Sequence, residues 1–163
     1  MKLNIRKIVP ADAESCFNIQ HAQHFHERGL YSQDSWKFIT QMLTDSWVAT
    51  LDDVITSGGT QLVVGHNIGI IQNLEDSLVP QEYHNLLAYN ILDNCVHPDS
   101  RMSGVSGAIM DHVSESYPLI HTKIHADNQA AYHILTTRKF VVVNEVKDYY
   151  LDGGSMLVLV REG

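Results

Sequence analysis

The sequence predicts a mixed α/β domain, in which a twisted and mostly antiparallel sheet is flanked by about four helices. Alternating apolar and polar residues indicate half-buried strands, and apolar residues at helical spacing indicate helices. The expected order of elements is β-α-α-β-β-β-α-β-α-β-β. Strands that follow one another directly are expected to pair antiparallel, whereas a strand–helix–strand unit in the second half implies a locally parallel pair.

The first half is expected to hold one strand, two helices and two further strands. Pro10 suits the first turn of the first helix, and Ser32 or Asp34 can cap the second. Gly65 and Gly69 are expected to mark bends or bulges in the long strand that closes this half. The expected ranges are 3–8, 10–27, 33–44, 47–51 and 62–74, with a turn over 52–60.

The second half alternates between strands and helices. After a polar connection over 75–85, an apolar strand leads into a Pro turn and a helix. Asp127 or Asn128 can cap the last helix, and Gly153 and Gly154 lie in a turn before the last strand. The expected ranges are 86–96, 103–115, 119–125, 128–137, 140–146 and 155–160.

Composition sets broad limits on the class of protein. An apolar fraction of 44% and a charged fraction of 18% are ordinary for a globular protein of 163 residues. The formal charge of −8 argues against nucleic acid as a partner, and no apolar run is long enough to cross a membrane. The N-terminus shows no apolar signal block, and Cys16 and Cys95 are expected to be buried, reduced thiols, so we expect a cytoplasmic protein. A homodimer is compatible with these data.

The most informative segment spans residues 96–108, where a strand gives way to a helix. A Pro turn is followed by Arg101 and by a run of small residues that opens the helix. Free backbone N–H groups at a helix N-terminus form an anion site that suits phosphate. The segment is not a P-loop, because the Gly-Lys-Ser/Thr ending is absent, and its glycines are wrongly spaced for a dinucleotide fingerprint.

Three features of the chain together resemble the GNAT superfamily of CoA-dependent N-acetyltransferases. Val96-His97-Pro98 resembles the family's Val-x-Pro turn, and residues 101–106 resemble its Arg/Gln-x-x-Gly-x-Gly/Ala loop, with Ser106 in the last position. Residues 128–131 resemble its later Asn-x-x-Ala motif, and Phe140 follows at the expected distance, although Lys139 replaces the usual Gly. The element order also agrees, so the resemblance covers residues 1–163 as a single acetyltransferase-like domain whose central strands splay apart.

This resemblance implies a binding site for acetyl-CoA. The pantetheine arm would run along residues 94–96, with the amide of Asn94 on the thioester carbonyl and Asn128 on the other side of the arm. Arg101 would lie beside the pyrophosphate. The residues implied in cofactor binding are Asn94, Cys95, Val96, Arg101, Met102, Ser103, Gly104, Val105, Ser106, Gly107 and Asn128.

The implied reaction is direct attack of a primary amine, from a small molecule or a peptide, on the acetyl thioester. The chain departs from the family at three positions that often carry acid or base groups, which here are Leu135, Asn90 and Lys123. An alternative is therefore a catalytically degenerate module that binds acyl-CoA for regulation. Transfer of a longer acyl group is a further alternative.

Other side chains could supply the missing acid and base. Tyr150 is the predicted acid and His125 the predicted base, because a histidine titrates near neutrality. Asp93 has the opposite strand parity to Asn90 and Asn94, so its side chain is expected to face away from the ligand. The alternatives are Tyr132 and Tyr149 for the acid and Asp93, Glu75, His121 or a bound water for the base.

In this family the first helix and the loop after it usually line the acceptor pocket. His24, His26 and Tyr31 are therefore the predicted substrate contacts. A metal site formed by the histidines of this segment is not expected, because His26 lies well round the helix from His21 and His24 and no Cys or Glu completes the set.

Overall fold

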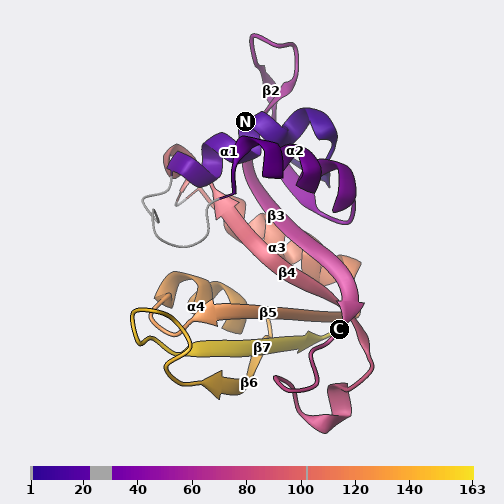
Figure 1. Ribbon diagram of the computed structural model, residues 1–163. Helices are drawn as coiled ribbons and strands as arrows, with labels where there is room; N and C mark the ends of the chain where they lie inside the picture. Colours follow the sequence, from indigo (N-terminus) through magenta and orange to yellow (C-terminus); the bar gives the residue numbers. More distant parts are fainter. Residues whose placement is uncertain (1, 23–30, 102) are drawn as a thin grey trace. The chain divides into compact units, whose positions relative to one another are not determined.

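The computed structural model describes residues 2–22, 31–101 and 103–163 (Figure 1). The chain divides into two compact units, which we describe one at a time. Unit 1 comprises Met1–Gly69 and Asp93–Ile109, and unit 2 comprises Ile70–Leu92 and Met110–Gly163. The hydrogen-bonding order of the seven strands is β1-β2-β3-β4-β5-β7-β6, in agreement with a mixed, mostly antiparallel sheet.

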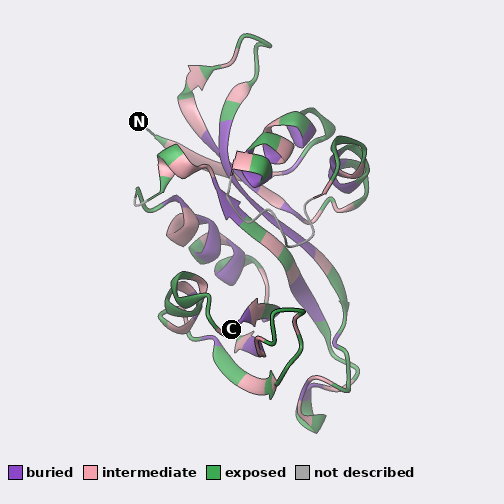
Figure 2. Cartoon of the chain, turned by 60° about the vertical axis from the view of Figure 1, so that its left-hand side comes forward, coloured by how far each residue is buried: buried purple, intermediate pink, exposed green. Residues whose placement is uncertain are grey.

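Unit 1 contains three antiparallel strands and two helices. β1 pairs with β2, and β2 pairs with β3. Helices α1 and α2 each have buried residues on one side and exposed residues on the other (Figure 2), and Ser32 caps α2 by accepting a hydrogen bond from Ser35 N. The elements are β1 (Leu3–Lys7), α1 (Ala13–Ala22), α2 (Gln33–Met42), β2 (Trp47–Ile55), the first part of β3 (Gln61–Asn73), the end of β4 (Leu87–Val96) and the start of α3 (Val105–Ser116).

The core of unit 1 forms where both helices contribute apolar side chains. Its buried members are Ile8, Ala13, Cys16, Ile19, Trp36, Ile39, Val48, Val63, Ile68 and Cys95. A polar contact anchors the start of the unit: the Asp12 carboxylate, 4% exposed, accepts two hydrogen bonds of 2.8 Å from Arg6 and one of 2.9 Å from Val9 N. Satisfying the buried carboxylate in this way is required, since an unpaired buried charge is strongly destabilising.

Unit 2 contains the parallel pair. β4 and β5 (Leu119–His125) are parallel, in register over Tyr89–Ile91 and Ile120–Thr122. β7 (Met156–Glu162) pairs antiparallel with both β5 and β6 (Val141–Val146), and α4 (Gln129–Thr136) connects β5 to β6. The buried core members are Leu74, Val79, Tyr83, Ala88, Leu119, Met156, Val158 and Val160.

The element order and the parallel pair are confirmed, and several boundaries differ from expectation. β2 continues past residue 51 to Ile55, because Ile55 pairs with Gln61 and the turn is confined to the residues between them. β7 continues to Glu162, because Glu162 pairs with Leu119. The first helix is preceded by a 3-10 turn at Pro10–Asp12, and α1 itself begins at Ala13.

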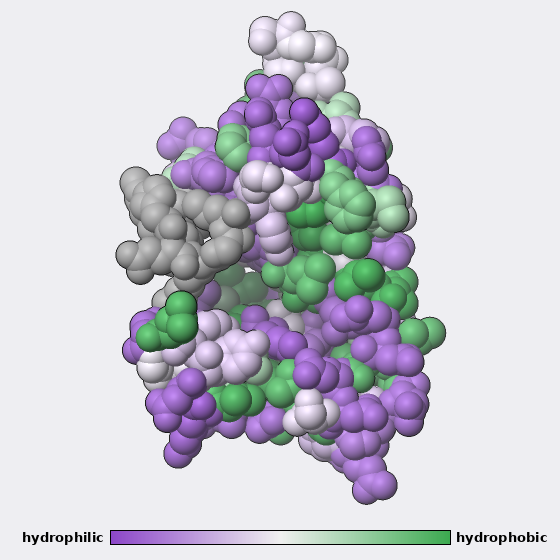
Figure 3. Space-filling model, viewed as in Figure 1, coloured by the Kyte–Doolittle hydropathy of each residue, from purple (hydrophilic) through white to green (hydrophobic). Residues whose placement is uncertain are grey.

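The predicted bulge at Gly65 is confirmed by a register shift between β2 and β3. Ala49 pairs with Gly65, whereas Thr50 pairs with Val63, so Val64 is the extra residue. Cys16 and Cys95 are free and buried, as expected. Among the described helices none is long and apolar enough to cross a membrane. On the face shown in Figure 3, apolar side chains lie among hydrophilic ones.

Candidate functional site

The turn after β4 is held by its own backbone. His97 N donates to Val64 O over 2.8 Å, and the His97 ring Nδ1 accepts from Asp99 N over 3.2 Å. Pro98–Ser100 forms a single 3-10 turn, closed by Arg101 N donating to Pro98 O over 3.2 Å. The chain is therefore fixed where it leaves the strand and enters the small-residue loop.

That loop presents backbone N–H groups at the start of α3. Gly104 has a φ of 81°, and a Cβ added there would meet no heavy atom of the described residues within 4 Å. The first helical hydrogen bond is from Ala108 N to Gly104 O, 2.9 Å, so the amides of residues 105–107 precede the helix's own ladder. The Ser103 hydroxyl donates to Ser100 O and tightens the loop, and Arg101 is exposed beside it. Met102 lies outside the described residues.

Side chains from three elements meet behind this loop. Asn67 Nδ2 on β3 donates to Asn94 Oδ1 over 3.1 Å, and Asn94 Nδ2 donates to Ser106 Oγ on α3 over 3.3 Å. A Cβ on Gly65 would lie 3.0 Å from Ile109 Cδ1 and 3.2 Å from Cys95 O. Ser106, the departure from the family's small-residue ending, thus ties the helix start to β4.

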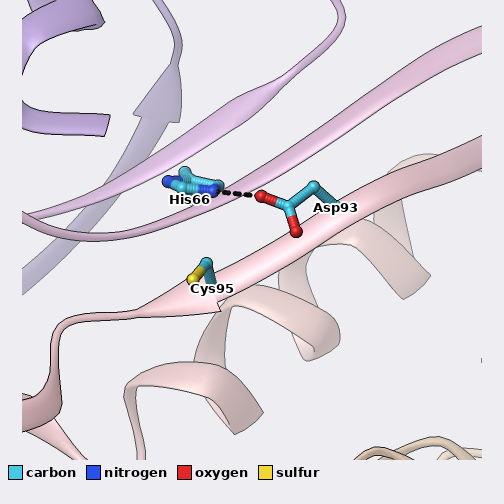
Figure 4. A group of neighbouring side chains, drawn as sticks. All are labelled: His66, Asp93 and Cys95. Atoms are coloured by element: carbon cyan, nitrogen blue, oxygen red, sulfur yellow. Dashed lines mark hydrogen bonds and ion pairs between the residues drawn. The ribbon is translucent and has the colours of Figure 1, made fainter. Parts of the chain in front are cut away.

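A second polar group lies on the opposite side of β4, as the strand parity of Asp93 predicts. Asp93 Oδ2 is 2.6 Å from Nε2 of His66 on β3 (Figure 4). Gln20 Nε2 on α1 donates to the same oxygen over 3.4 Å. His66 is fully buried, whereas the Asp93 side chain is 25% exposed. Sequence reasoning missed this pairing because His66 and Asp93 are far apart in the chain and neither belongs to a motif.

The same amide of Gln20 also reaches the segment predicted to contact substrate. Gln20 Oε1 accepts from Tyr31 N over 2.9 Å and from Trp36 Nε1 over 3.3 Å. Burial, and secondarily the negative charge of Asp93, raise the pKa of Tyr31. Tyr31 is thereby linked to Asp93 through one side chain, whereas the other two predicted substrate contacts, His24 and His26, lie outside the described residues.

His66, Asp93 and Cys95 are also the one group of metal-ligating residues found in the described part of the chain. Their ligand atoms lie within 4.8 Å of one another (Figure 4). Two ligands on a tetrahedral zinc ion are roughly 3.3 Å apart, given Zn–N and Zn–O bonds of about 2.0–2.1 Å. The 2.6 Å contact between His66 and Asp93 is shorter than that and is a short, direct hydrogen bond. The arrangement fits a hydrogen-bonded pair better than a metal site.

In unit 2, the positions where the family often has bases are engaged in other contacts. Asn90 Nδ2 donates to the backbone oxygens of Ala88, 3.0 Å, and Gln72, 3.3 Å, which leaves Asn90 Oδ1 to accept from His121 Nδ1 over 2.7 Å. Lys123 Nζ is 3.3 Å from Glu75 Oε2, and this contact, with a hydrogen bond from Ser77, lowers the pKa of Glu75.

These groups line an open cavity of about 110 Å³ in unit 2. His121 is 4% exposed, and its Nε2 is buried with no hydrogen-bond partner in the part of the chain that the structure describes. Burial, and then the charge of Lys123, lower the pKa of His121 to about 4. The cavity is lined by Gln72, Asn73, Glu75, Asn90, Ile91, Leu92, His121 and Lys123.

The structure brings the predicted acid and base together in unit 2. The rings of His125 and Tyr150 stack with centroids 4.7 Å apart. His125 Nε2 contacts both Asp152 carboxylate oxygens, 3.1 and 3.2 Å, and its Nδ1 accepts from Asp127 N over 3.1 Å. Both ring nitrogens of His125 therefore have hydrogen-bond partners.

The remaining predicted residues of unit 2 lie on or beside α4. Asn128 caps the helix, its Oδ1 accepting from Ala131 N over 3.1 Å. Leu135, at the position of the family's usual acid, is 5% exposed and belongs to the buried face of the helix. Tyr132 and Tyr149 are 38% and 53% exposed.

Comparison with solved structures identifies the fold. Arabidopsis thaliana NAA60 in complex with acetyl-CoA is similar over 99% of this chain and all of its own, with a TM-score of 0.76 and 16% identity. The ribosomal-protein-S18-alanine N-acetyltransferase of Escherichia coli covers 99% of this chain and 94% of its own (TM-score 0.73, 14% identity). Ard1 from Thermoplasma volcanium covers 99% and 98% (TM-score 0.72, 21% identity). No protein-family model and no curated protein sequence matches the chain. The chain has the GNAT fold.

Proposed function

We propose that this GNAT-fold chain is a single-domain N-acetyltransferase that transfers the acetyl group of acetyl-CoA to a primary amine by direct attack. The observation that carries the proposal is the loop before α3, where the backbone amides of residues 105–107 precede the helix's own ladder and Arg101 is exposed in the same loop. Backbone donors at a helix N-terminus suit a pyrophosphate. The Asn94–Ser106 hydrogen bond supports it, because it fixes the helix start relative to the strand that would bind the pantetheine arm.

The loop before α3 and the end of β4 fit the pyrophosphate and the pantetheine arm of CoA. The amides of residues 103–107, together with Met102, would hold the pyrophosphate, and the backbone of Asn94–Val96 would hold the arm, with Asn128 as a further contact. The amide of Asn94 would also stabilise the oxyanion that forms on the thioester carbonyl; one such donor is worth about 3 kcal/mol. Tyr150 as the acid and His125 as the base remain proposals.

We propose a peptide or small-molecule amine as the acceptor and the cytoplasm as the location. The likeness to an enzyme named for a ribosomal-protein alanine supports an α-amino group, and two free buried thiols support a reducing compartment.

The test of this proposal is Gly104→Glu, which places a negative charge in the open space of the loop. We expect acetyl-CoA affinity to fall at least tenfold by isothermal titration calorimetry, while the fold survives. Gly59→Glu is the matched control, because Gly59 has a similar φ of 78°, equally open surroundings, and a place in the β2–β3 turn instead. Equal affinities for both variants would show that the pyrophosphate does not bind at this loop.

One observation favours a second function, a regulatory module that binds acyl-CoA without turnover. At the three positions where the family often has acid or base groups, Leu135 is buried, Asn90 is hydrogen-bonded to His121, and Lys123 is paired with Glu75. None of the three side chains is available as an acid or a base. A thiol-release assay with acetyl-CoA and a panel of amines separates the two functions. Tight binding without thiol release across the panel supports the regulatory module.

A further inference from the structure

Only one of the two oxygens of the Asp93 carboxylate accepts hydrogen bonds from described residues. Both of its hydrogen bonds, from His66 and Gln20, reach Oδ2. Oδ1 has no partner among the residues that the structure describes, and the side chain is 25% exposed. The nearby core is apolar, including Cys16, whose pKa is raised by burial and, to a smaller extent, by the charge of Asp93. Asp93 thus has one carboxylate oxygen without a described partner on a partly exposed side chain at the edge of the apolar core of unit 1.

We infer that Asp93 binds the ammonium group of the acceptor and takes up its proton, and that His66 and Gln20 are positioning residues. This inference rests on the proposed function and deepens it, since it names the group that recognises and deprotonates the acceptor. Asp93 precedes Asn94, whose backbone amide is the proposed donor to the thioester carbonyl.

The geometry of a strand explains how Asp93 can reach an amine that attacks a thioester bound at Asn94. Backbone N–H groups point sideways in the plane of a sheet, whereas side chains stand above and below it. A thioester bound to the amide of Asn94 would lie beside the strand, and an amine has to approach the carbonyl carbon from one face. Asp93 projects to the face that carries α1, Gln20 and Tyr31, and the Asn94 side chain projects to the face of α3.

The proton balance is complete without any other reactant. The ammonium gives one proton to the Asp93 carboxylate, and Asp93 releases it to solvent through its exposed side. The neutral amine attacks the thioester carbon, a C–N bond forms, and the C–S bond breaks with its electron pair moving to sulfur. The second amine proton reaches that sulfur, so the products are the acetamide and the free thiol of CoA.

His66 holds the Asp93 carboxylate in place because the His66 ring is itself fixed by its buried surroundings. Its ring is fully buried beside Trp36, with ring centroids 4.9 Å apart, and its Nδ1 has no hydrogen-bond partner among the described residues. The hydrogen on Nε2 is therefore directed at Asp93 Oδ2, and the free Oδ1 is oriented away from it. Without this contact the Asp93 carboxylate would rotate, and Oδ1 would no longer be held in one orientation.

The experiment compares the wild-type protein with Asp93→Asn, which keeps the shape and removes the charge, and with the control Asp53→Asn, an exposed acid on β2 of the same unit. The acceptor probe is a pool of pentapeptides that together carry all twenty N-terminal residues; the same pool with acetylated N-termini is the neutral probe. Calorimetry gives the affinity for acetyl-CoA and the affinity of CoA-saturated protein for each pool. Thiol release gives kcat and KM.

We expect Asp93→Asn to leave acetyl-CoA affinity within twofold of wild type, to weaken binding of the free-amine pool at least tenfold, and to leave the acetylated pool unchanged. Its kcat should fall by roughly 10²–10⁴, the usual contribution of a positioned base. Asp93→Glu should restore part of kcat, and His66→Gln should lower kcat while sparing acetyl-CoA affinity. Asp53→Asn should match wild type throughout.

The outcomes distinguish this inference from the proposed function. If wild type binds acetyl-CoA and the free-amine pool but releases no thiol, the proposed function fails, and the amine affinities alone decide about Asp93. The inference is overturned if Asp93→Asn binds the free-amine pool or turns over like wild type, or if wild type binds no free amine. If Asp93→Asn does not fold, Asp93→Glu and His66→Gln carry the comparison, and wild-type values for both overturn the inference.

Discussion

Acidification should destabilise unit 2 through His121. The ring is 4% exposed, Nδ1 donates to Asn90 Oδ1 over 2.7 Å, and a proton on Nε2 would have no acceptor among the residues described in the structure. Burial and Lys123 lower the pKa from 6.5 to about 4 in the folded protein. The unfolded chain therefore takes up the proton first as the pH falls. The stability that the neutral ring provides is complete above pH 6.5, is lost between 6.5 and about 4, and changes no further below that.

The size of the effect follows from the shift. A shift of about 2.5 pH units, at 1.36 kcal/mol per unit, corresponds to about 3 kcal/mol. The assay is urea unfolding followed by circular dichroism at a series of pH values from 7.5 to 4, on wild type and on His121→Gln, whose amide can still donate to Asn90. Subtracting the two curves removes the contributions of other titrating groups. A difference that stays constant across this range would refute the argument.

Two further variants test contacts of unit 2 by chemical denaturation. Gly154→Ala should lower the free energy of unfolding by about 1–3 kcal/mol, because its Cβ would clash with His125 Nε2 and lie 2.8 Å from Asp152 Oδ1. Gly58→Ala is the control, because its Cβ would meet nothing closer than 3.7 Å. Equal losses of stability in the two variants would count against the clash. Asn128→Ala should cost about 1 kcal/mol through loss of the α4 cap. Asn128→Asp retains an acceptor and should stay close to wild type; a comparable loss in both variants would contradict the capping role.

Local signals in the sequence were enough to predict the elements and the loop before α3. Helical spacing, Ser32 and Asn128 as caps, and the glycine at position 104 act over a few residues, and each is found in its expected place. The parity of Asp93 is another local property, and the structure agrees with it.

Partners contributed by distant parts of the chain could not be predicted. The contacts of Asp93 come from α1 and β3, and no sequence pattern near Asp93 predicts either contact. His125 looks like a free base in the sequence because Asp152 is 27 residues away. Ser106 looks like a departure from a motif until Asn94 is seen to bind it. In each case the tertiary contact changes what the residue can do.

The bulge at Gly65 has a consequence for how loss-of-function variants should be interpreted. A Cβ on Gly65 would lie 3.2 Å from Val105 Cγ1 and 3.0 Å from Ile109 Cδ1. A side chain at this position would therefore push against the first turns of α3. The displaced helix would carry the loop with it. In a random-mutagenesis screen, position 65 should therefore score as a ligand-affinity position, although its own atoms face apolar side chains and a strand carbonyl.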